Sequence, residues 1–184
     1  MLIKWSAIGM VLCLVCSCGT TSRSNPDTGR KKTMKLTSSA FREGESIPKQ
    51  YTGDGADVSP PLAWDSVPEG VKSFALICDD PDAPRGTWVH WTLYDLPPEA
   101  RSLAENTPRT RTLANGARQG LNDSGKIGYA GPYPPSGTHR YYFKLYALDA
   151  RVNRDPGLTK EHLLQAMQGH ILAEAQLMGR YSRR

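Results

Sequence analysis

The sequence lacks the short motifs that identify several common enzyme classes. It has no Gly-x-Ser-x-Gly nucleophile turn, no P-loop and no dinucleotide-binding motif, because Gly53-x-Gly55 is too short and follows no clear strand–helix unit. Cys78 is a poor nucleophile, since a thiol within an apolar strand has a raised pKa. Nothing in the sequence is positive evidence for catalytic turnover. We therefore predict a protein that is not an enzyme and needs no cofactor.

Long hydrophobic runs are also missing. The apolar run Trp5–Val15 is shorter than the roughly 20 residues that a membrane-spanning helix requires. It follows a lone charge at Lys4, which is typical of a secretory signal peptide. The sequence Val15-Cys-Ser-Cys18 then resembles a bacterial lipobox, so we expect residues 1–17 to be removed and Cys18 to carry lipid, palmitate included. An ordinary signal peptide with a chance cysteine is the alternative.

The residues after the lipobox bear on location and domain organisation. Gly19 stands where many Gram-negative lipoproteins of the inner membrane carry an aspartate. We expect a lipid-anchored protein of the bacterial cell envelope, in the outer membrane if the host is Gram-negative. Residues 18–33 are rich in Ser, Thr, Gly and basic residues, which predicts a flexible tether. Residues 34–184 fit one domain, given the usual size of about 100–200 residues.

Cysteine is scarce, with four residues in a chain of 184. Cys13 and Cys16 lie in the leader and Cys18 is the expected lipid site, so Cys78 has no partner. No disulfide is expected, and the one remaining thiol of an exported protein should be buried in its strand.

The net charge of +5 at pH 7 comes largely from the two ends of the chain. Basic residues concentrate in the predicted tether and in residues 180–184. These are chain ends rather than a basic patch with interleaved aromatic residues, so nucleic-acid binding is not expected.

Seventeen glycines and fourteen prolines favour strands joined by turns over a helix bundle. Apolar runs predict strands at Met34–Phe41, Ile47–Tyr51, Val71–Cys78, Thr87–Leu96 and Thr138–Asp149. A short helix is predicted at Pro97–Glu105, because proline and an acid suit a first turn. A longer helix is predicted at Thr159–Met178, where apolar residues recur every three or four positions between a Thr159 N-cap and Gly179. We expect a mostly-β fold in which a large antiparallel sheet packs on a smaller one, with the C-terminal helix beside a pocket.

Polar side chains gather where three of these strands end. Proline must end the first strand after Asp80, because it lacks the N–H that a sheet ladder needs. Alternate side chains of a strand share a face. The residues expected to face together are Trp88, His90 and Thr92 (opposite Val89, Trp91 and Leu93), and His139, Tyr141 and Phe143 (opposite Arg140, Tyr142 and Lys144). The pattern predicts a small, anion-sized site rather than a groove.

Three interpretations of Asp80, His90 and His139 remain open from the residues alone. In the first, they form an anion pocket in which the aspartate fixes the histidine tautomers. In the second, they are a two-histidine, one-carboxylate metal site for hydrolysis. In the third, they are a buried polar network whose members satisfy one another. Asp54 and Asp57 in the Gly-rich loop before Pro60 lack the spacing of a calcium loop. They are interpreted as solvated turn residues.

Two of these regions also resemble a known family. Asp80-Pro-Asp-Ala-Pro84 with Trp88 and His90, followed by Gly137-x-His-Arg-Tyr141, is similar to the two signature regions of the phosphatidylethanolamine-binding protein family, also called the Raf kinase inhibitor protein family. The order and separation of the motifs fit, and the resemblance runs from about Met34 onward. The compact chain resembles the bacterial branch.

The resemblance implies roles for individual residues and a class of ligand. Residues matching the family's pocket for phosphorylethanolamine-like head groups are Asp80, Trp88, His90, Gly131, Pro132, His139 and Tyr141. Asp82 and Arg140 match positions with a structural role. The expected partner is a phosphate-bearing small molecule or lipid head group. Kinase inhibition is not carried over, since an exported protein does not meet cytosolic kinases; inhibition of an envelope protein is the alternative, and no protein partner is identified.

Overall fold

The structure is a computed structural model that describes Leu2 and residues 33–183. The predicted lipobox, Cys18 and nearly all of the predicted tether therefore lie outside the described residues. Contacts divide the chain into two units, Met1–Lys31 and Lys32–Arg184, and the fold is that of the second unit. No helix among the described residues is long and apolar enough to cross a membrane.

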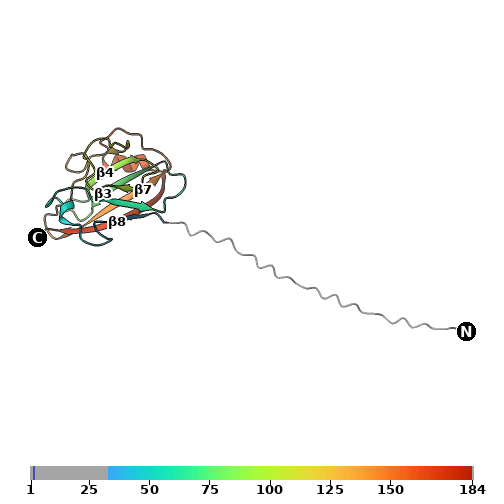
Figure 1. The fold of residues 1–184 in the computed structure, drawn as a ribbon, viewed down its shortest axis with the longest axis horizontal. Coiled ribbons are helices and arrows are strands. Elements are labelled where there is room, and N and C mark those ends of the chain that lie inside the picture. The colour runs from blue at the N-terminus through green and yellow to red at the C-terminus, as the bar shows by residue number, and fades with distance from the viewer. Residues whose placement is uncertain (1, 3–32, 184) are drawn as a thin grey trace. The chain divides into compact units, whose positions relative to one another are not determined.

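Two antiparallel sheets make up this unit, as the sequence predicts (Figure 1). The small sheet has the order β1 (Lys35–Thr37), β2 (Leu62–Asp65), β5 (Ser102–Leu103). The large sheet has the order β6 (Arg118–Gln119), β4 (Trp88–Leu96), β3 (Ser73–Asp80), β7 (Thr138–Leu148), β8 (Ile171–Ser182). A helix, α1 (Lys160–Met167), completes the fold.

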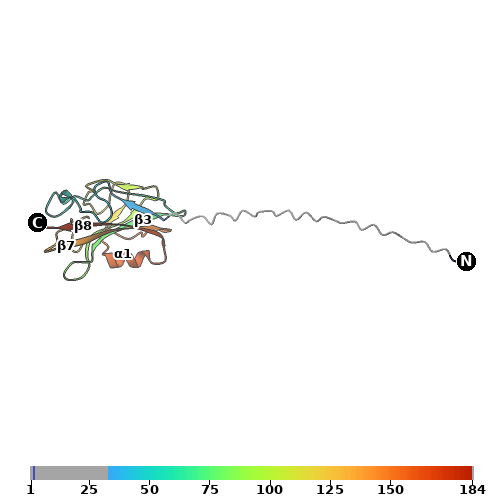
Figure 2. The ribbon, with the colours of Figure 1, turned by 90° about the horizontal axis from the view of Figure 1, so that it is seen from below.

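The elements stack in three layers, with the large sheet in the middle (Figure 2). Its inner face packs against the small sheet, where Phe74, Leu76 and Cys78 join Leu36 and Trp64 in the main core. Its outer face carries α1. All eight residues of β3 are buried because both faces of this strand are covered, which explains its continuous apolar run.

The helix α1 begins as predicted but ends early. The Thr159 hydroxyl caps it by accepting a hydrogen bond from the His162 N–H. Leu163 and Met167 are buried in a second core with Ile77 on the outer face of the large sheet. Helical structure then stops, and Gly169 adopts a φ of +80°, which favours glycine.

The prediction of one helix over Thr159–Met178 is therefore wrong in its second half, which is the edge strand β8. The buried residues Ala175, Leu177 and Gly179 alternate with exposed or half-buried ones, which is a period of two. Short apolar segments fit helical and strand periods alike, and here pairing along β7 decides the outcome. Gly179 does not end a helix. A Cβ there would lie 2.5 Å from Cγ1 of Ile47, so the residue permits close packing.

Two shorter predictions are also wrong. Pro97–Glu105 is not a helix: the Ala100 N–H donates to the Pro97 carbonyl in a single turn, and Ser102–Leu103 then pairs with β2. The segment expected to be a strand at Ile47–Tyr51 contains a 3₁₀ turn, η1 (Lys49–Tyr51), that follows Pro48. Cys78 is buried and forms no disulfide among the described residues.

Candidate functional site

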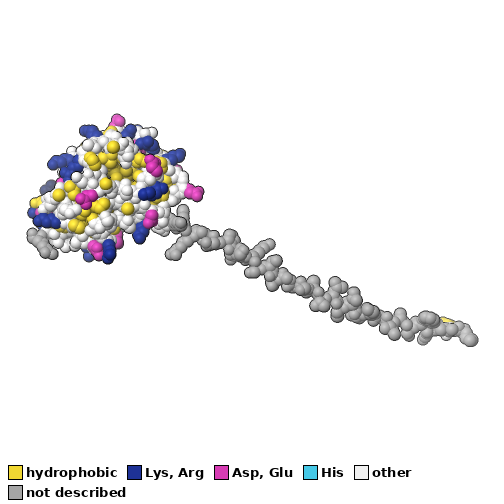
Figure 3. Space-filling model, in the orientation of Figure 1, with side chains coloured by type: hydrophobic (Ala, Val, Ile, Leu, Met, Phe, Trp, Pro, Cys, Tyr) yellow, Lys and Arg dark blue, Asp and Glu magenta, His cyan; other side chains and the backbone are white. Residues whose placement is uncertain are grey.

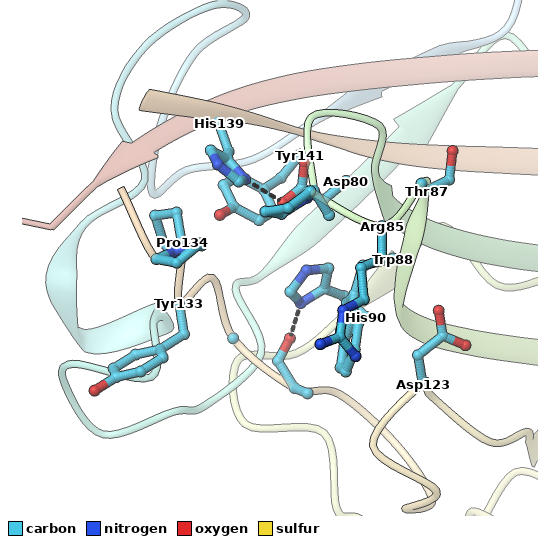
Figure 4. A pocket seen from close by; sticks show the side chains of 16 residues that line it. Asp80, Arg85, Thr87, Trp88, His90, Asp123, Tyr133, Pro134, His139 and Tyr141 are labelled. Atoms are coloured by element: carbon cyan, nitrogen blue, oxygen red, sulfur yellow. Dashed lines mark hydrogen bonds and ion pairs between the residues drawn. The ribbon is translucent and has the colours of Figure 1, made fainter. Parts of the chain in front are cut away.

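A pocket of about 720 Å³ opens at the end of the large sheet where β3 ends and β4 and β7 begin (Figure 4). Six of the seven predicted ligand residues line it, namely Asp80, Trp88, His90, Gly131, His139 and Tyr141. The seventh, Pro132, does not line the pocket. It is buried behind the wall, where its carbonyl accepts a hydrogen bond from the Gly53 N–H.

A β-bulge in β4 turns His90 toward the pocket. Cys78 pairs with Trp91 and Asp79 with Val89, so β4 contains one more residue than β3 at this point. The ring of His90 meets that of Tyr141 edge-on at 5.1 Å between centroids, on the inner face of the sheet. Beyond the bulge the alternation is reversed, as bulges require. The prediction that His90 and Thr92 share a face is therefore wrong, because Thr92 pairs with Ile77 and lies on the outer face with it.

Asp80 and His139 form a buried pair on the pocket floor. Nδ1 of His139 lies 2.7 Å from Oδ2 of Asp80, and the side chains are 8% and 5% exposed. A carboxylate only accepts, so Nδ1 carries the proton and Nε2 is left for another partner. The other carboxylate oxygen of Asp80 accepts the Asp82 N–H at 2.8 Å and closes the turn after β3.

His90 is oriented by the backbone across the pocket. Its Nδ1 lies 2.7 Å from the Ala130 carbonyl oxygen, which also only accepts, so Nδ1 carries the proton. Burial lowers the pKa of His90 below its usual value of 6.5, although the Ala130 carbonyl and Asp80 act in the opposite direction. At neutral pH the ring is uncharged, and Nε2 is a hydrogen-bond acceptor.

Tyr141 adds a hydroxyl group that has no protein partner. The side chain is 1% exposed, and its oxygen makes no hydrogen bond to any described residue. Burial raises the pKa of Tyr141 well above its usual range, so the group stays a neutral donor. An unpartnered buried hydroxyl costs folding free energy, and its position in the wall of a pocket is where a ligand would satisfy it.

The segment that orients His90 is itself held by Asp57, a residue that sequence reasoning interpreted as solvated. Oδ1 of Asp57 accepts the Gly131 N–H at 2.6 Å, and Oδ2 pairs with Arg109 at 2.6 Å. A Cβ on Gly131 would lie 2.7 Å from Cα of Thr52, so only glycine fits here. Contacts this distant in sequence leave no local signal, and the interpretation of Asp57 as a simple turn residue is corrected.

Asp82 and Arg140 form a pair beside the pocket rather than inside it. The Asp82 carboxylate accepts hydrogen bonds from the backbone N–H, Nε and one terminal nitrogen of Arg140 at 2.6–2.9 Å. These bonds lower the pKa of Asp82 to about 2. Neither residue lines the pocket, which agrees with the structural role that the resemblance implies.

The mouth of the pocket is mostly apolar and includes residues that the sequence did not single out. Figure 4 shows Tyr133 and Pro134 on one side, with Trp88, Arg85 and Asp123 on the other. Arg85 directly follows the first motif and could have been found from it. Asp123 comes from the long connection before β7, and its carboxylate accepts the Val89 N–H at 2.7 Å, a contact without a sequence signature.

Charges elsewhere on the surface are mixed. On the face seen in Figure 3, acidic and basic side chains are interspersed around hydrophobic ones. Within the described part of the chain, no three His, Cys, Asp or Glu side chains are grouped so as to hold a metal ion. Two oriented imidazoles and a neutral hydroxyl therefore lie together in one pocket.

Comparison with known proteins identifies the family. The sequence profile described as phosphatidylethanolamine-binding protein matches residues 37–182. A protein of Methanothermobacter thermautotrophicus named UPF0098 is 53% identical over 150 residues, which cover 82% of this chain and 99% of that protein. A UPF0098 protein of Aquifex aeolicus is 48% identical over 153 residues, covering 82% of this chain and 89% of that protein.

Solved structures agree. A putative phosphatidylethanolamine-binding protein homologue from Chlamydia trachomatis has a TM-score of 0.77 and 47% identity, covering 83% of this chain and 99% of that one. E. coli YbcL, described as a new member of the mammalian family, has a TM-score of 0.76 and 33% identity, covering 82% and 99%. The chain belongs to the phosphatidylethanolamine-binding protein family. Its relatives include an archaeal protein, so the resemblance extends beyond the bacterial branch that the sequence predicts.

Proposed function

We propose that the pocket binds the phosphate group of a small molecule or lipid head group. The observation that carries this proposal is the unpartnered hydroxyl of Tyr141, buried beside His90 and His139. Three polar groups that point into one apolar pocket are the usual means of orienting a small ligand. The Tyr141 hydroxyl and Nε2 of each histidine have no hydrogen-bond partner among the described residues.

The donors and acceptors suit a phosphate monoanion. The Tyr141 hydroxyl donates to a phosphate oxygen, and the neutral Nε2 of His90 accepts the proton of a P–OH group. Nε2 of His139, the ring nitrogen that Asp80 does not contact, is the third polar atom of the site. The carboxylate of Asp80, which accepts the hydrogen bond from Nδ1 of His139, opposes a second negative charge nearby. Since the second pKa of phosphomonoesters is about 6, we expect binding to strengthen as the pH falls from 8 to 6.

The proposed role is binding rather than turnover. Cys78 is buried, and burial raises the pKa of its thiol well above the usual value, so it is not a nucleophile at neutral pH. Ser136 lies outside the pocket lining. No side chain of the pocket is a nucleophile paired with a general base, which covalent catalysis would need.

The test of the pocket is titration of the purified protein with phosphorylethanolamine and inorganic phosphate by calorimetry. His90→Ala and His139→Ala should each abolish binding while leaving the free energy of unfolding within about 2 kcal/mol of the wild type. His162→Ala is a matched control, because His162 lies on α1 away from the pocket. Unchanged affinity in both pocket variants would refute the assignment.

We also propose that the protein is anchored to the cell envelope through a lipid on Cys18. The support is the sequence alone: an apolar run too short to span a bilayer, followed by a cysteine in a lipobox-like context. One acyl chain holds a protein only marginally, so more than one chain on Cys18 is expected. Cys18→Ser should move the protein from the membrane to the soluble envelope fraction, and retention in membranes would contradict the anchor.

A further inference from the structure

A second hollow lies on the other side of His139 from the pocket. It has a volume of about 500 Å³, and its lining includes Asp82, Ser136, Thr138, His139, Arg140 and Arg180. We call it the outer depression. His139 is the one residue that lines both hollows.

Strand pairing brings two arginines together in the outer depression. Arg140 of β7 lies directly opposite Arg180 of β8. The backbone N–H of Arg180 donates to Glu45 and its carbonyl accepts from Ile47, so both groups point away from β7. The two arginines therefore form a non-hydrogen-bonded pair, the type in which opposite side chains approach most closely and share a face.

Only one of these two charges is balanced. The Asp82 carboxylate is fully engaged by Arg140, from which it accepts three hydrogen bonds. Arg180 makes no ion pair within the described residues, and like charges directly opposite in a sheet destabilise it. The hydroxyls of Ser136 and Thr138 are exposed and donate no hydrogen bond to another described residue.

We propose that the outer depression is a second oxyanion site, in which the Arg180 guanidinium binds the anion and the hydroxyls of Ser136 and Thr138 donate hydrogen bonds to it. Guanidinium groups bind phosphate-type oxyanions through paired N–H donors. A bound anion also removes the repulsion between Arg140 and Arg180. The ligand class is phosphate or a phosphate ester, either a second group of the ligand in the pocket or a separate ion. This site does not depend on the function proposed for the pocket.

The experiment is a titration of the full chain with sodium phosphate at constant ionic strength, followed by NMR. The Arg180 Nε–H and Thr138 amide signals should shift saturably and together. The signal of Arg154, an exposed arginine beyond the other end of β7, should show no saturable shift. Arg180→Gln should weaken the isotherm reported by Thr138 at least tenfold, whereas Arg154→Gln should leave it unchanged. The Arg180→Gln protein should melt no lower than the wild type, because a like-charge pair is lost.

Two further measurements, one on a pocket variant and one with a different probe, separate this site from the pocket and identify the source of the anion. His90→Ala should abolish the isotherm reported by the Trp88 indole N–H, which belongs to the pocket alone, and leave the isotherm reported by Arg180. Failure of binding at one hollow is thereby distinguished from failure at the other. With pyrophosphate as the probe, one shared isotherm would assign both sites to one ligand, and two separate isotherms would assign them to two ions. No saturable shift of Arg180, or an Arg180→Gln protein with an unchanged Thr138 isotherm, would overturn the proposal.

Discussion

Two buried tyrosines near the pocket differ in what their hydroxyl groups contact. Tyr129 donates to the Tyr51 carbonyl at 2.7 Å, whereas the Tyr141 hydroxyl has no protein partner. Tyr129→Phe leaves a buried carbonyl unsatisfied and should lower the free energy of unfolding by about 1–3 kcal/mol. Tyr141→Phe should leave it unchanged or slightly higher, and should weaken phosphate binding by about tenfold to a hundredfold, the value of one hydrogen bond to a charged group.

Urea denaturation and calorimetry on the two variants measure these effects side by side. Equal loss of stability in both proteins would mean that the Tyr141 hydroxyl has a structural partner. Full phosphate affinity in Tyr141→Phe would remove this hydroxyl from the binding site.

The buried imidazole of His90 should make stability depend on pH. Its pKa is lowered by burial in the folded protein, so the unfolded chain takes up the proton first as the pH falls below about 6.5. The free energy of unfolding should therefore fall between pH 6.5 and the lower folded-state pKa, by at most about 1.4 kcal/mol per pH unit. Stability above pH 6.5 is unaffected by this group.

His90→Gln is the matching variant, because its side-chain amide can still donate to Ala130. The difference between the denaturation curves of wild type and variant from pH 4 to 8 isolates the contribution of His90 from that of other histidines. A wild-type slope that the variant retains in full would show that His90 is not the group responsible.

Site residues placed by regular alternation along one strand could be predicted from the sequence. Site residues placed by a bulge or by contacts between distant loops could not. His139 and Tyr141 face the pocket because they alternate along an uninterrupted strand. His90 reaches the same place through a bulge, which alternation does not reveal. Asp57 and Ala130 contribute through contacts that span 74 and 40 residues of sequence, for which a single sequence has no signal.

At the scale of elements, Gly179 separates the strand seen here from the helix that the sequence favours. In β8 a Cβ at this position would lie 2.5 Å from Cγ1 of Ile47 and 2.8 Å from Cε2 of Phe41. Gly179→Ala should therefore destabilise the protein by about 1–3 kcal/mol through overpacking. The same change at the end of a helix interior would stabilise it by about 1 kcal/mol.

The direction in which Gly179→Ala shifts the denaturation midpoint decides whether this residue lies in a strand or in a helix. Gly116→Ala is a useful comparison, because no atom lies within 4 Å of the Cβ position there and only the positive φ of +84° opposes the change. A stabilised Gly179→Ala protein would contradict the pairing of β8 with β7 at this point.

The position of each strand in its sheet explains which strands could be predicted from the sequence. Strands β3, β4 and β7 occupy the middle of the large sheet, so their apolar runs are long and unambiguous. β8 is an edge strand, exposed at alternate positions, and its leucines, its alanines and Met178 suit a helix equally well. Short strands such as β5 exist only through pairing and have no pattern of their own.

For the whole molecule, the one cysteine of the described residues serves as a reporter of unfolding. Cys78 is 1% exposed in the middle of the large sheet, and burial raises the pKa of its thiol. In protein with Cys13, Cys16 and Cys18 replaced by Ser, a thiol reagent should react only with unfolded molecules. The reaction rate should rise steeply with urea and follow the loss of secondary structure. Rapid stoichiometric reaction of the native protein would show that the sheet opens locally around Cys78.

The position of β8 in the sheet has a consequence for biosynthesis. This strand covers the whole length of β7, and Gly44 and Ile47 near the start of the domain bond to its backbone. A nascent chain that ends before residue 171 cannot close this edge, however much of it has left the ribosome. The β7 edge of the large sheet therefore stays unpaired until the last dozen residues of the fold have been synthesised.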